Sequence, residues 1–495
     1  MSKIIIQNGN MCELDLPLKF AQKLYNEFAI RHPNAFYLRT RQRGMQNWDG
    51  KIHYITKTGQ FKIGLLPKVY DMCIEMGIKP KVVDMRQPLP KVSKVVTNIG
   101  KYKLRPEQEK AVKAVINNKI GNTPFHIGVL DYTVNAGKTL IMSSLYLSYK
   151  KQLKTLLITN DSDWLNQARE EFKQYLPGED ITFVQGKVLN WSNFTIGMVQ
   201  SISRNMRFYQ KELSQIDMVL IDEADQGGSK QYQNVITRLF NTRIRIGLSG
   251  TIYMSKLAKD MVKNMNLECF FGKVLAEFKL KDSIKKGYST KTVVKMVPGK
   301  PWYGNWESDC ISYKEIYDDS ITNCYTAWLM AYNRLLWNLN QGRYPALVVC
   351  KHIAHCENLY KFFKKKLGDA YNIAYVHVNT PSKLRQQIMK DFREGKIDIL
   401  VSTTIIARGK NFPKLKYLLN TASMDSQEKS IQFLGRLVRT DESKNKVYLD
   451  DLHYPGNYLD RHGKHRKQYY QRQELKVILL DKLWKKHPNH SLIKS

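Results

Sequence analysis

A seven-residue segment, Thr133 to Thr139 (TVNAGKT), has the residue types and spacing that bind phosphate. It follows the apolar run FHIGVL and precedes a helical pattern, which is the context that a phosphate-binding loop requires. Backbone N–H groups and the helix N-terminus would hold the phosphates, Lys138 would reach the β and γ oxygens, and Thr139 would hold Mg²⁺. The rest of the predicted nucleotide-binding loop is Asn135, Ala136 and Gly137.

The loop departs from the usual pattern at two positions. Tyr132 stands where a first Gly is usual, and Asn135 stands where Gly or Ser is common. Asn tolerates a positive φ better than most residues, so the loop conformation remains accessible. The alternative interpretation is an ordinary corner between a strand and a helix.

Two adjacent carboxylates follow a second apolar run, MVLI. Asp222 would bind Mg²⁺, and Glu223 would orient and deprotonate the attacking water, because phosphoryl transfer depends on positioning and on charge neutralisation. The alternative, a solvated acidic turn, is less consistent with their position after a phosphate-binding loop. The pattern therefore predicts a site that hydrolyses Mg-ATP.

The elements that must position these residues form two series. Between about 122 and 250, short apolar runs alternate with helical patterns, and a second series of the same kind runs from ALVVC to KVYLD. Continuous apolar runs are typical of parallel strands with both faces covered. We expect an α/β protein with two lobes, each built on a parallel sheet.

The composition indicates a polyanionic partner. The chain of 495 residues holds 79 Lys and Arg against 44 Asp and Glu, a formal charge of +35. No apolar run is long enough to span a bilayer, and the first residues lack a signal-peptide core, so we expect a cytoplasmic protein, in the host cytoplasm if phage-encoded. The sequence predicts four domains. They are a basic N-terminal module with a small α+β fold (1–95), an ATP-binding lobe (96–268), a second lobe (269–450) and a helical, basic C-terminal extension (451–495).

The ordered motifs resemble those of the superfamily 2 helicases over nearly the whole chain, and this resemblance implies that the two lobes are tandem RecA-like lobes. Gln432 to Arg439 matches Q-x-x-G-R-x-x-R in full, and on helical spacing Gln432, Arg436 and Arg439 share a face. The resemblance implies that Gln432 is catalytic and that Arg436 and Arg439 are arginine fingers of the second lobe, acting on ATP bound to the first. It also implies adenine reading by Arg105 and Gln108, coupling by Ser249 and Thr251, and motif V at Thr403 to Gly409. In that motif Thr403 would contact nucleic acid and Gly409 the nucleotide.

The N-terminal segment is similar to the bacteriophage UvsW family of recombination helicases. The similarity includes Asn47-Trp48-Asp49-Gly50 and GLLPKVYDMCIEMGIKPKV, and it implies branch migration, fork regression, unwinding and annealing of DNA. Residues 36–56 are expected to form two strands around an Asp49-Gly50 turn. The predicted nucleic-acid contacts are Arg39, Arg41, Arg43, Trp48, Lys51, Gln200 and Ser201. Trp48 packed into a small core is the alternative for that residue.

Other motif positions depart from the family. Asn160-Asp161 stands where many relatives have Pro-Thr in motif Ia, and Lys410 follows Gly409 where an acid is frequent. Both departures weaken what the resemblance implies, namely a strand contact at motif Ia and the nucleotide contact of Gly409. In the C-terminal part, bases and aromatics between Arg461 and Arg472 follow a DNA backbone or form a solvated helix face.

We expect a Mg-ATP-dependent DNA helicase or translocase, monomeric, that binds branched or forked DNA, with phage recombination proteins as candidate partners. Three alternatives remain. The first is an RNA helicase, because residues 222–225 spell the DEAD tetrapeptide that is typical of that class. The others are the motor of a restriction system and a non-enzymatic annealing protein. The complete ATP constellation disfavours the last.

Overall fold

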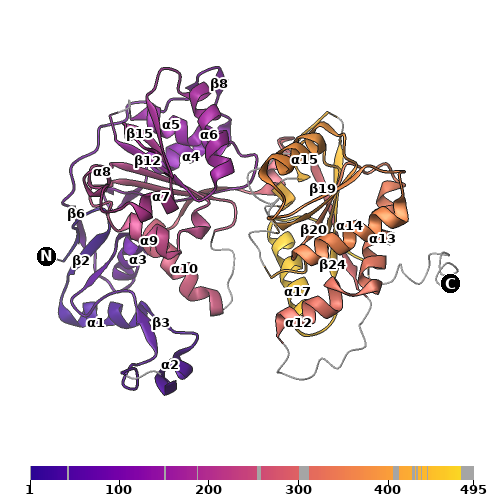
Figure 1. The fold of residues 1–495 in the computed structure, drawn as a ribbon. Helices are drawn as coiled ribbons and strands as arrows, with labels where there is room; N and C mark the ends of the chain where they lie inside the picture. Colours follow the sequence, from indigo (N-terminus) through magenta and orange to yellow (C-terminus); the bar gives the residue numbers. More distant parts are fainter. Residues whose placement is uncertain are drawn as a thin grey trace. The chain divides into compact units, whose positions relative to one another are not determined.

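The computed structural model describes two compact units, residues 1–278 and 279–495. The described residues are 2–41, 44–149, 152–186, 188–252, 258–299, 312–404, 412–425, 430, 433–435, 437–442 and 444–480. Each unit contains a large sheet with helices packed around it (Figure 1). The predicted division at residues 95, 268 and 450 stays a prediction. Among the described helices, none is long and apolar enough to cross a membrane.

The first unit is built on an eight-stranded sheet in the order β14-β13-β15-β12-β16-β17-β11-β18. All neighbouring strands are parallel except β13 and β14. In that order the strands are Val188–Leu189, Ile181–Gln185, Phe194–Met198, Thr155–Thr159, Met218–Asp222, Ile244–Ser249, His126–Tyr132 and Val274–Phe278. The central strands β11, β12, β15, β16 and β17 are buried along their whole length, as their continuous apolar runs predict.

Helices α4 to α10 accompany this sheet. They are Pro106–Ile116, Lys138–Ser148, Ser162–Tyr175, Val199–Arg204, Gln210–Ser214, Lys230–Ile236 and Ala258–Phe271, with a short 3₁₀ turn, η2, at Ala224–Gln226. Two small hairpins, β7-β8 (Asn98–Ile99 and Tyr102–Lys103) and β9-β10 (Lys119–Ile120 and Thr123–Pro124), border α4 in the sequence.

The second unit is built on a seven-stranded, all-parallel sheet in the order β21-β22-β20-β23-β24-β19-β25. In that order the strands are Ile373–Val376, Ile399–Thr403, Ala346–Cys350, Tyr417–Asn420, Lys446–His453, Lys291–Pro298 and Val477–Leu479. The helices are α11 to α15 and α17: Leu280–Lys285, Tyr313–Tyr317, Tyr325–Leu339, Ile353–Leu367, Ser382–Glu394 and Asn457–Arg472, with the π-turn η3 at Asp318–Thr322. The two sheets confirm the predicted fold class, tandem RecA-like lobes.

The N-terminal residues form a smaller sheet inside the first unit, in the order β5-β2-β1-β6. Its strands are Gln60–Lys62, Met11–Asp15, Lys3–Ile6 and Lys81–Asp84. Helix α1 (Leu18–Glu27), the turn η1 (Ile63–Leu65) and helix α3 (Leu66–Glu75) complete it. One continuous hydrophobic core runs from this sheet, through Ile4 and Phe61, to Ile127 and Phe271 of the large sheet and its helix α10.

A buried arginine joins the two sheets of the first unit. The Arg245 guanidinium, in the middle of β17, donates to Gly9 O (2.7 Å), Asn10 Oδ1 (2.8 Å) and Phe270 O (3.1 Å). Removing residues 1–95 would expose the shared core and take away two of the three acceptors of this buried cation, so single substitutions test the N-terminal residues better than a deletion does.

The backbone at Gly64 packs against the end of α10 without room for a side chain. A Cβ there would lie 2.6 Å from Cys269 O and closer still to Glu268 O. Gly64→Ala is expected to destabilise the first unit by about 1–3 kcal/mol or more, since backbone oxygens cannot move aside as a flexible side chain can. Thermal unfolding measures this, with Gly228→Ala as control because its nearest side-chain atom is 3.7 Å away. Equal melting temperatures for both variants would contradict the close packing.

The expected pair of strands at residues 36–56 is wrong in its first half. Residues Ala35–Arg41 form helix α2, and the second strand, β4 (Lys51–His53), pairs with the preceding strand β3 (Ala29–Arg31). The three-residue spacing of Ala35 and Leu38, the more buried residues of the segment, fits a helix better than a strand. The turn at Gly50 is present, with φ 78°.

The C-terminal helix is present as α17, but its basic and aromatic face is partly internal. Arg466 is fully buried and donates to Asp451 Oδ1 (2.8 Å), and the Tyr470 hydroxyl donates to Asp451 Oδ2 (2.6 Å). Because these two side chains are sequestered, they cannot follow a DNA backbone; that part of the interpretation is wrong. Downstream of α17, β25 joins the edge of the large sheet beside β19.

Candidate active site

The phosphate-binding loop lies between β11 and α5, as predicted. Asn135 and Gly137 adopt positive φ values of 63° and 71°, and Gly137 is the N-cap of α5. A Cβ at Gly137 would collide with the Gln108 amide, so glycine is required there for two reasons. Lys138 and Thr139 open α5, where the first N–H groups have no acceptor within the helix. This is a donor-rich cradle of the kind that binds phosphate.

Tyr132, the unusual residue that precedes the loop, is buried and packs beneath the start of the loop, between α4 and β18. Its hydroxyl donates to Glu107 O at 2.7 Å, which ties the end of β11 to α4. Its ring lies 6.0 Å from that of Phe278 on β18, the neighbouring strand. The first glycine of the usual pattern is therefore replaced by a packed aromatic residue that anchors the adjacent helix.

Gln108 connects α4 to the loop through both ends of its amide. Its Oε1 accepts from Arg105 N (2.8 Å), and its Nε2 donates to Ala136 O (2.8 Å). Arg105 Nη1 lies 3.4 Å from Asn135 O, a longer contact to the same loop. The structure thus brings Arg105 and Gln108 to the phosphate-binding loop, while their predicted role in reading adenine stays a prediction.

The Gln108 contact allows a near-isosteric test. Gln108→Glu keeps the acceptor for Arg105 N but replaces the donor to Ala136 O with a carboxylate oxygen. We expect at least about tenfold weaker ATP binding, because a lost buried hydrogen bond costs about 1–3 kcal/mol and the added negative charge repels phosphate. Titration with a fluorescent nucleotide measures this against Gln210→Glu, the same change at an exposed site of α8. Unchanged ATP affinity in Gln108→Glu would show that the hydrogen bond from Gln108 to Ala136 O does not shape the loop.

Asp222 ends strand β16 in a buried position, with 4% of its surface exposed. Its Oδ1 has no hydrogen-bond partner among the described residues. Burial raises the pKa of Asp222, and the Lys138 charge opposes this. The charge of Lys138 therefore acts on Asp222, and the buried Oδ1 of Asp222 has no partner among the described residues. This arrangement fits a site in which Asp222 and Thr139 hold a divalent cation.

Glu223, the next residue, adopts a left-handed conformation with φ 53°. Burial, together with the charges of Asp222 and Asp225, raises its pKa to about 8. Positive charge added at Asp222, such as a bound divalent cation, would favour the ionised form of Glu223, which accepts a proton.

A hydrogen-bonded chain links the acidic turn to the end of β17. Ser249 Oγ donates to Asp225 Oδ1 at 2.7 Å and lies 3.1 Å from Thr251 Oγ1. Of the two predicted coupling residues, Ser249 therefore contacts Asp225 directly, and Thr251 is joined to Asp225 through Ser249. Sequence reasoning missed the role of Asp225, because its partner is 24 residues away in the chain.

Gln200 and Ser201, two of the predicted nucleic-acid contacts, hold neighbouring loops. Gln200 Nε2 donates to Asn160 O at 3.2 Å, and Ser201 Oγ accepts from Gly186 N at 2.9 Å. These contacts occupy part of both side chains, so their contact with nucleic acid stays a prediction.

The residues predicted in the second unit are only partly described. Thr403 ends β22 and is buried, and the Arg439 carbonyl accepts from Thr290 Oγ1 at 3.0 Å. Residues 433–435 and 437 are helical, but Val438 lies in a turn and Arg439 beyond it, so the predicted helical face does not extend to Arg439. Four predicted residues lie outside the described residues: Arg43, Gly409, Gln432 and Arg436.

The predicted N-terminal contacts lie together near α2. Arg39, Arg41 and Lys51 are exposed, whereas Trp48 is half-buried and its Nε1 donates to Lys51 O at 2.9 Å. The more accessible aromatic residues are Phe36 and Tyr37, which sequence reasoning missed because their segment was assigned to a strand.

Two family models match the chain. Residues 101–254 match the res subunit of type III restriction enzymes, and residues 329–441 match the helicase conserved C-terminal domain. The first match contains the phosphate-binding loop, the DEAD segment and Ser249 to Thr251. The second contains Thr403 and the arginine-rich segment.

Two curated relatives align over most of the chain. The helicase-family protein IRC3 of Saccharomyces cerevisiae is 24% identical over 377 residues, which cover 70% of this chain and 51% of that protein. Helicase 22 of the Sulfolobus islandicus filamentous virus is 22% identical over 385 residues, covering 71% and 64%. The chain thus spans about half to two thirds of the length of these relatives.

Solved structures share the fold. The type ISP restriction-modification enzyme LlaBIII bound to DNA has a TM-score of 0.56 at 15% identity, over 81% of this chain and 33% of that chain. Dbp5 of S. cerevisiae bound to RNA and ADP BeF3 has a TM-score of 0.52 at 14% identity, over 76% and 90%. The T4 UvsW structure aligns over 97% and 98% at 19% identity, with a TM-score of 0.44. The two matched family models and the paired RecA-like lobes that carry their motifs place this chain among the superfamily 2 helicases.

Proposed function

We propose that this protein is a Mg-ATP-dependent DNA helicase or translocase that acts on branched DNA. The observation that carries the proposal is the site at the carboxyl ends of β11 and β16. There a phosphate-binding loop and Lys138 lie close to Asp222, whose buried Oδ1 has no partner among the described residues.

Each residue of the site has a role in hydrolysis under this proposal. The loop N–H groups and Lys138 hold the phosphates, and Thr139 and Asp222 hold Mg²⁺, which when bound neutralises phosphate charge. Glu223 orients the attacking water and takes its proton once it is itself ionised. The Ser249-Asp225 hydrogen bond transmits the state of the site to β17.

Two observations support a nucleic acid as the polymer, and a third supports DNA. The formal charge of +35 suits a polyanion. The exposed cations Arg39, Arg41 and Lys51 lie on one segment of the first unit, next to exposed aromatic residues. The segment Asn47-Trp48-Asp49-Gly50 resembles a family that regresses forks and migrates branches. On these grounds we assign fork regression, branch migration, unwinding and annealing.

The proposal is tested with a labelled synthetic fork and ATP. The unaltered protein is expected to convert the fork to its regressed duplex products, and Lys138→Ala is expected to bind the fork without converting it. Conversion without ATP would instead indicate an annealing protein. If the protein leaves the DNA fork unchanged but unwinds an RNA duplex, it is an RNA helicase.

A further inference from the structure

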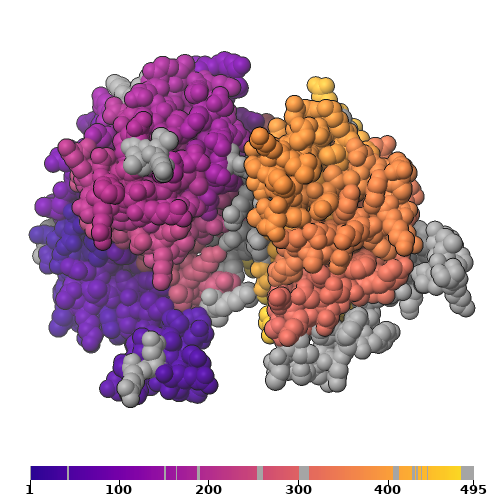
Figure 2. Space-filling view, in the orientation of Figure 1, coloured from indigo at the N-terminus to yellow at the C-terminus, as the bar shows by residue number. Residues whose placement is uncertain are grey.

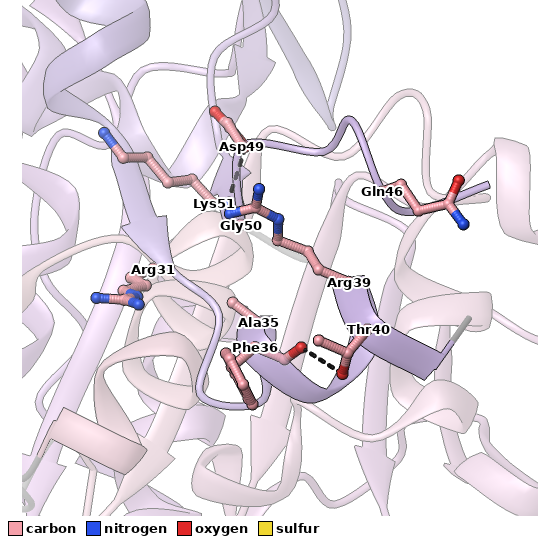
Figure 3. A pocket seen from close by; sticks show the side chains of 9 residues that line it. All are labelled: Arg31, Ala35, Phe36, Arg39, Thr40, Gln46, Asp49, Gly50 and Lys51. Atoms are coloured by element: carbon pink, nitrogen blue, oxygen red, sulfur yellow. Dashed lines mark hydrogen bonds between the residues drawn. The ribbon is translucent and has the colours of Figure 1, made fainter. Parts of the chain in front are cut away.

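A cavity lies beside helix α2. This helix belongs to the part of the first unit that projects away from the large sheet (Figures 1 and 2). Its volume is about 530 Å³, within the range of about 300–1,000 Å³ typical of small-ligand sites. Figure 3 shows its lining around an opening between α2 and the turn before β4. The lining residues are Arg31, Ala35, Phe36, Arg39, Thr40, Gln46, Asp49, Gly50 and Lys51.

The charge of this cavity favours an anion. Arg31, Arg39 and Lys51 are all exposed, and within the described part of the chain neither arginine forms an ion pair. Asp49 is the one carboxylate in the lining, and it is already engaged. Its Oδ1 accepts from Lys51 N at 2.9 Å and its Oδ2 lies 2.6 Å from His53 Nε2. The cavity therefore offers the donors of three cations and a carboxylate that is already engaged, an arrangement that suits phosphodiester groups.

The aromatic residues of α2 add a stacking surface. Phe36 is 79% exposed and lines the cavity, and its neighbour Tyr37 is 54% exposed with the Arg41 guanidinium 4.8 Å from its ring centre. The Thr40 hydroxyl donates to Phe36 O at 3.0 Å, within the same helix (Figure 3). An exposed phenyl ring beside free guanidinium groups is suited to the flat face of a nucleobase.

We propose that this cavity binds an unpaired nucleotide of a DNA strand, with the base against Phe36 and the flanking phosphates against Arg31, Arg39 and Lys51. The inference rests on the proposed function for the identity of the polymer. In a duplex the faces of the bases are covered by the base pairs stacked above and below, so Phe36 would select unpaired nucleotides, such as those at a fork.

The segment that forms the cavity is connected to the rest of the first unit through packed contacts. The His53 ring stacks on Tyr25 of α1 at 4.0 Å, and the Tyr54 hydroxyl donates to Asn266 Oδ1 of α10 at 3.0 Å. The adjoining N-terminal sheet shares its core with the large sheet. A strand held at α2 would therefore be held at a fixed place relative to the phosphate-binding loop of the same unit.

The test measures equilibrium binding without nucleotide, using fluorescence anisotropy of three probes: an oligothymidylate, a matched abasic oligomer and a blunt duplex. Phe36→Ala is expected to weaken binding of the oligothymidylate by about 5- to 150-fold and to leave the other two unchanged. Arg39→Ala is expected to weaken binding of both oligomers and to lower the log–log salt slope by about 0.7. The matched controls on α1 are Leu18→Ala, which removes a side chain that is 78% exposed, and Lys23→Ala, which removes an exposed cation.

The inference is overturned if Phe36→Ala binds the oligothymidylate as the unaltered protein does, or if it loses the same factor on the abasic oligomer. Failure of the proposed function has a different signature. ATP hydrolysis by the unaltered protein would then be stimulated by RNA and not by DNA, whatever the Phe36 variant does in the binding assay.

Discussion

Lys138→Ala is expected to lower the rate of ATP hydrolysis by at least about 10²-fold while the protein stays folded and binds DNA. The loss of one such electrostatic contact to a reacting phosphate commonly costs this much. Lys138 opens α5 beside the loop and influences the buried Asp222, so the substitution acts on charge and leaves the core intact. Steady-state phosphate release measures the effect, with Lys211→Ala, an exposed cation of the same unit, as control.

Glu223→Gln is expected to reduce turnover by a similar factor for a separate reason. Glutamine keeps the shape of the side chain but cannot accept a proton from the attacking water. The control is Glu170→Gln, which changes an exposed carboxylate of α6. Turnover near the unaltered rate in Lys138→Ala or Glu223→Gln would disprove the assignment of the site.

Arg439→Ala is also expected to have a large effect, on turnover much more than on ATP affinity. An arginine finger stabilises charge that develops on the transferring phosphate, and it is worth about 10³–10⁵ in rate when supplied in trans and less in some motors. The backbone of Arg439 is fixed by Thr290, so alanine removes the guanidinium without releasing the segment.

Single-turnover hydrolysis and nucleotide titration separate the two effects of Arg439→Ala. Lys390→Ala removes one exposed positive charge from α15 of the same unit and controls for net charge. Weaker ATP binding with unchanged turnover in Arg439→Ala would contradict the arginine-finger hypothesis.

The two large sheets could be predicted because their strands bury both faces. A strand such as β16 then reads as an unbroken apolar run, and the carboxylate that follows it marks the end of the strand at the sheet edge. The phosphate-binding loop was predictable for a related reason, since Gly137 and Lys138 have fixed places relative to the strand and the helix.

Other features depend on partners far away in the sequence. The Tyr132 hydroxyl donates a hydrogen bond to Glu107 O, and Gln108 Nε2 donates one to Ala136 O. Hydrogen bonds from side chains to distant backbone carbonyls are not revealed by any sequence pattern. Arg466 is a further case, because a lysine- and arginine-rich helix resembles a solvated face until the buried Asp451 is found beside it. Helix α2 was missed because a short aromatic segment is compatible with either a strand or a helix.

The proposed function is tested most directly by the ATPase rate of the unaltered protein with single-stranded DNA, forked DNA and RNA measured side by side. The account predicts strong stimulation by both DNA substrates, greatest with the fork, and little by RNA, with all stimulation lost in Lys138→Ala. Stimulation by RNA alone, or a rate that no nucleic acid changes, would contradict it.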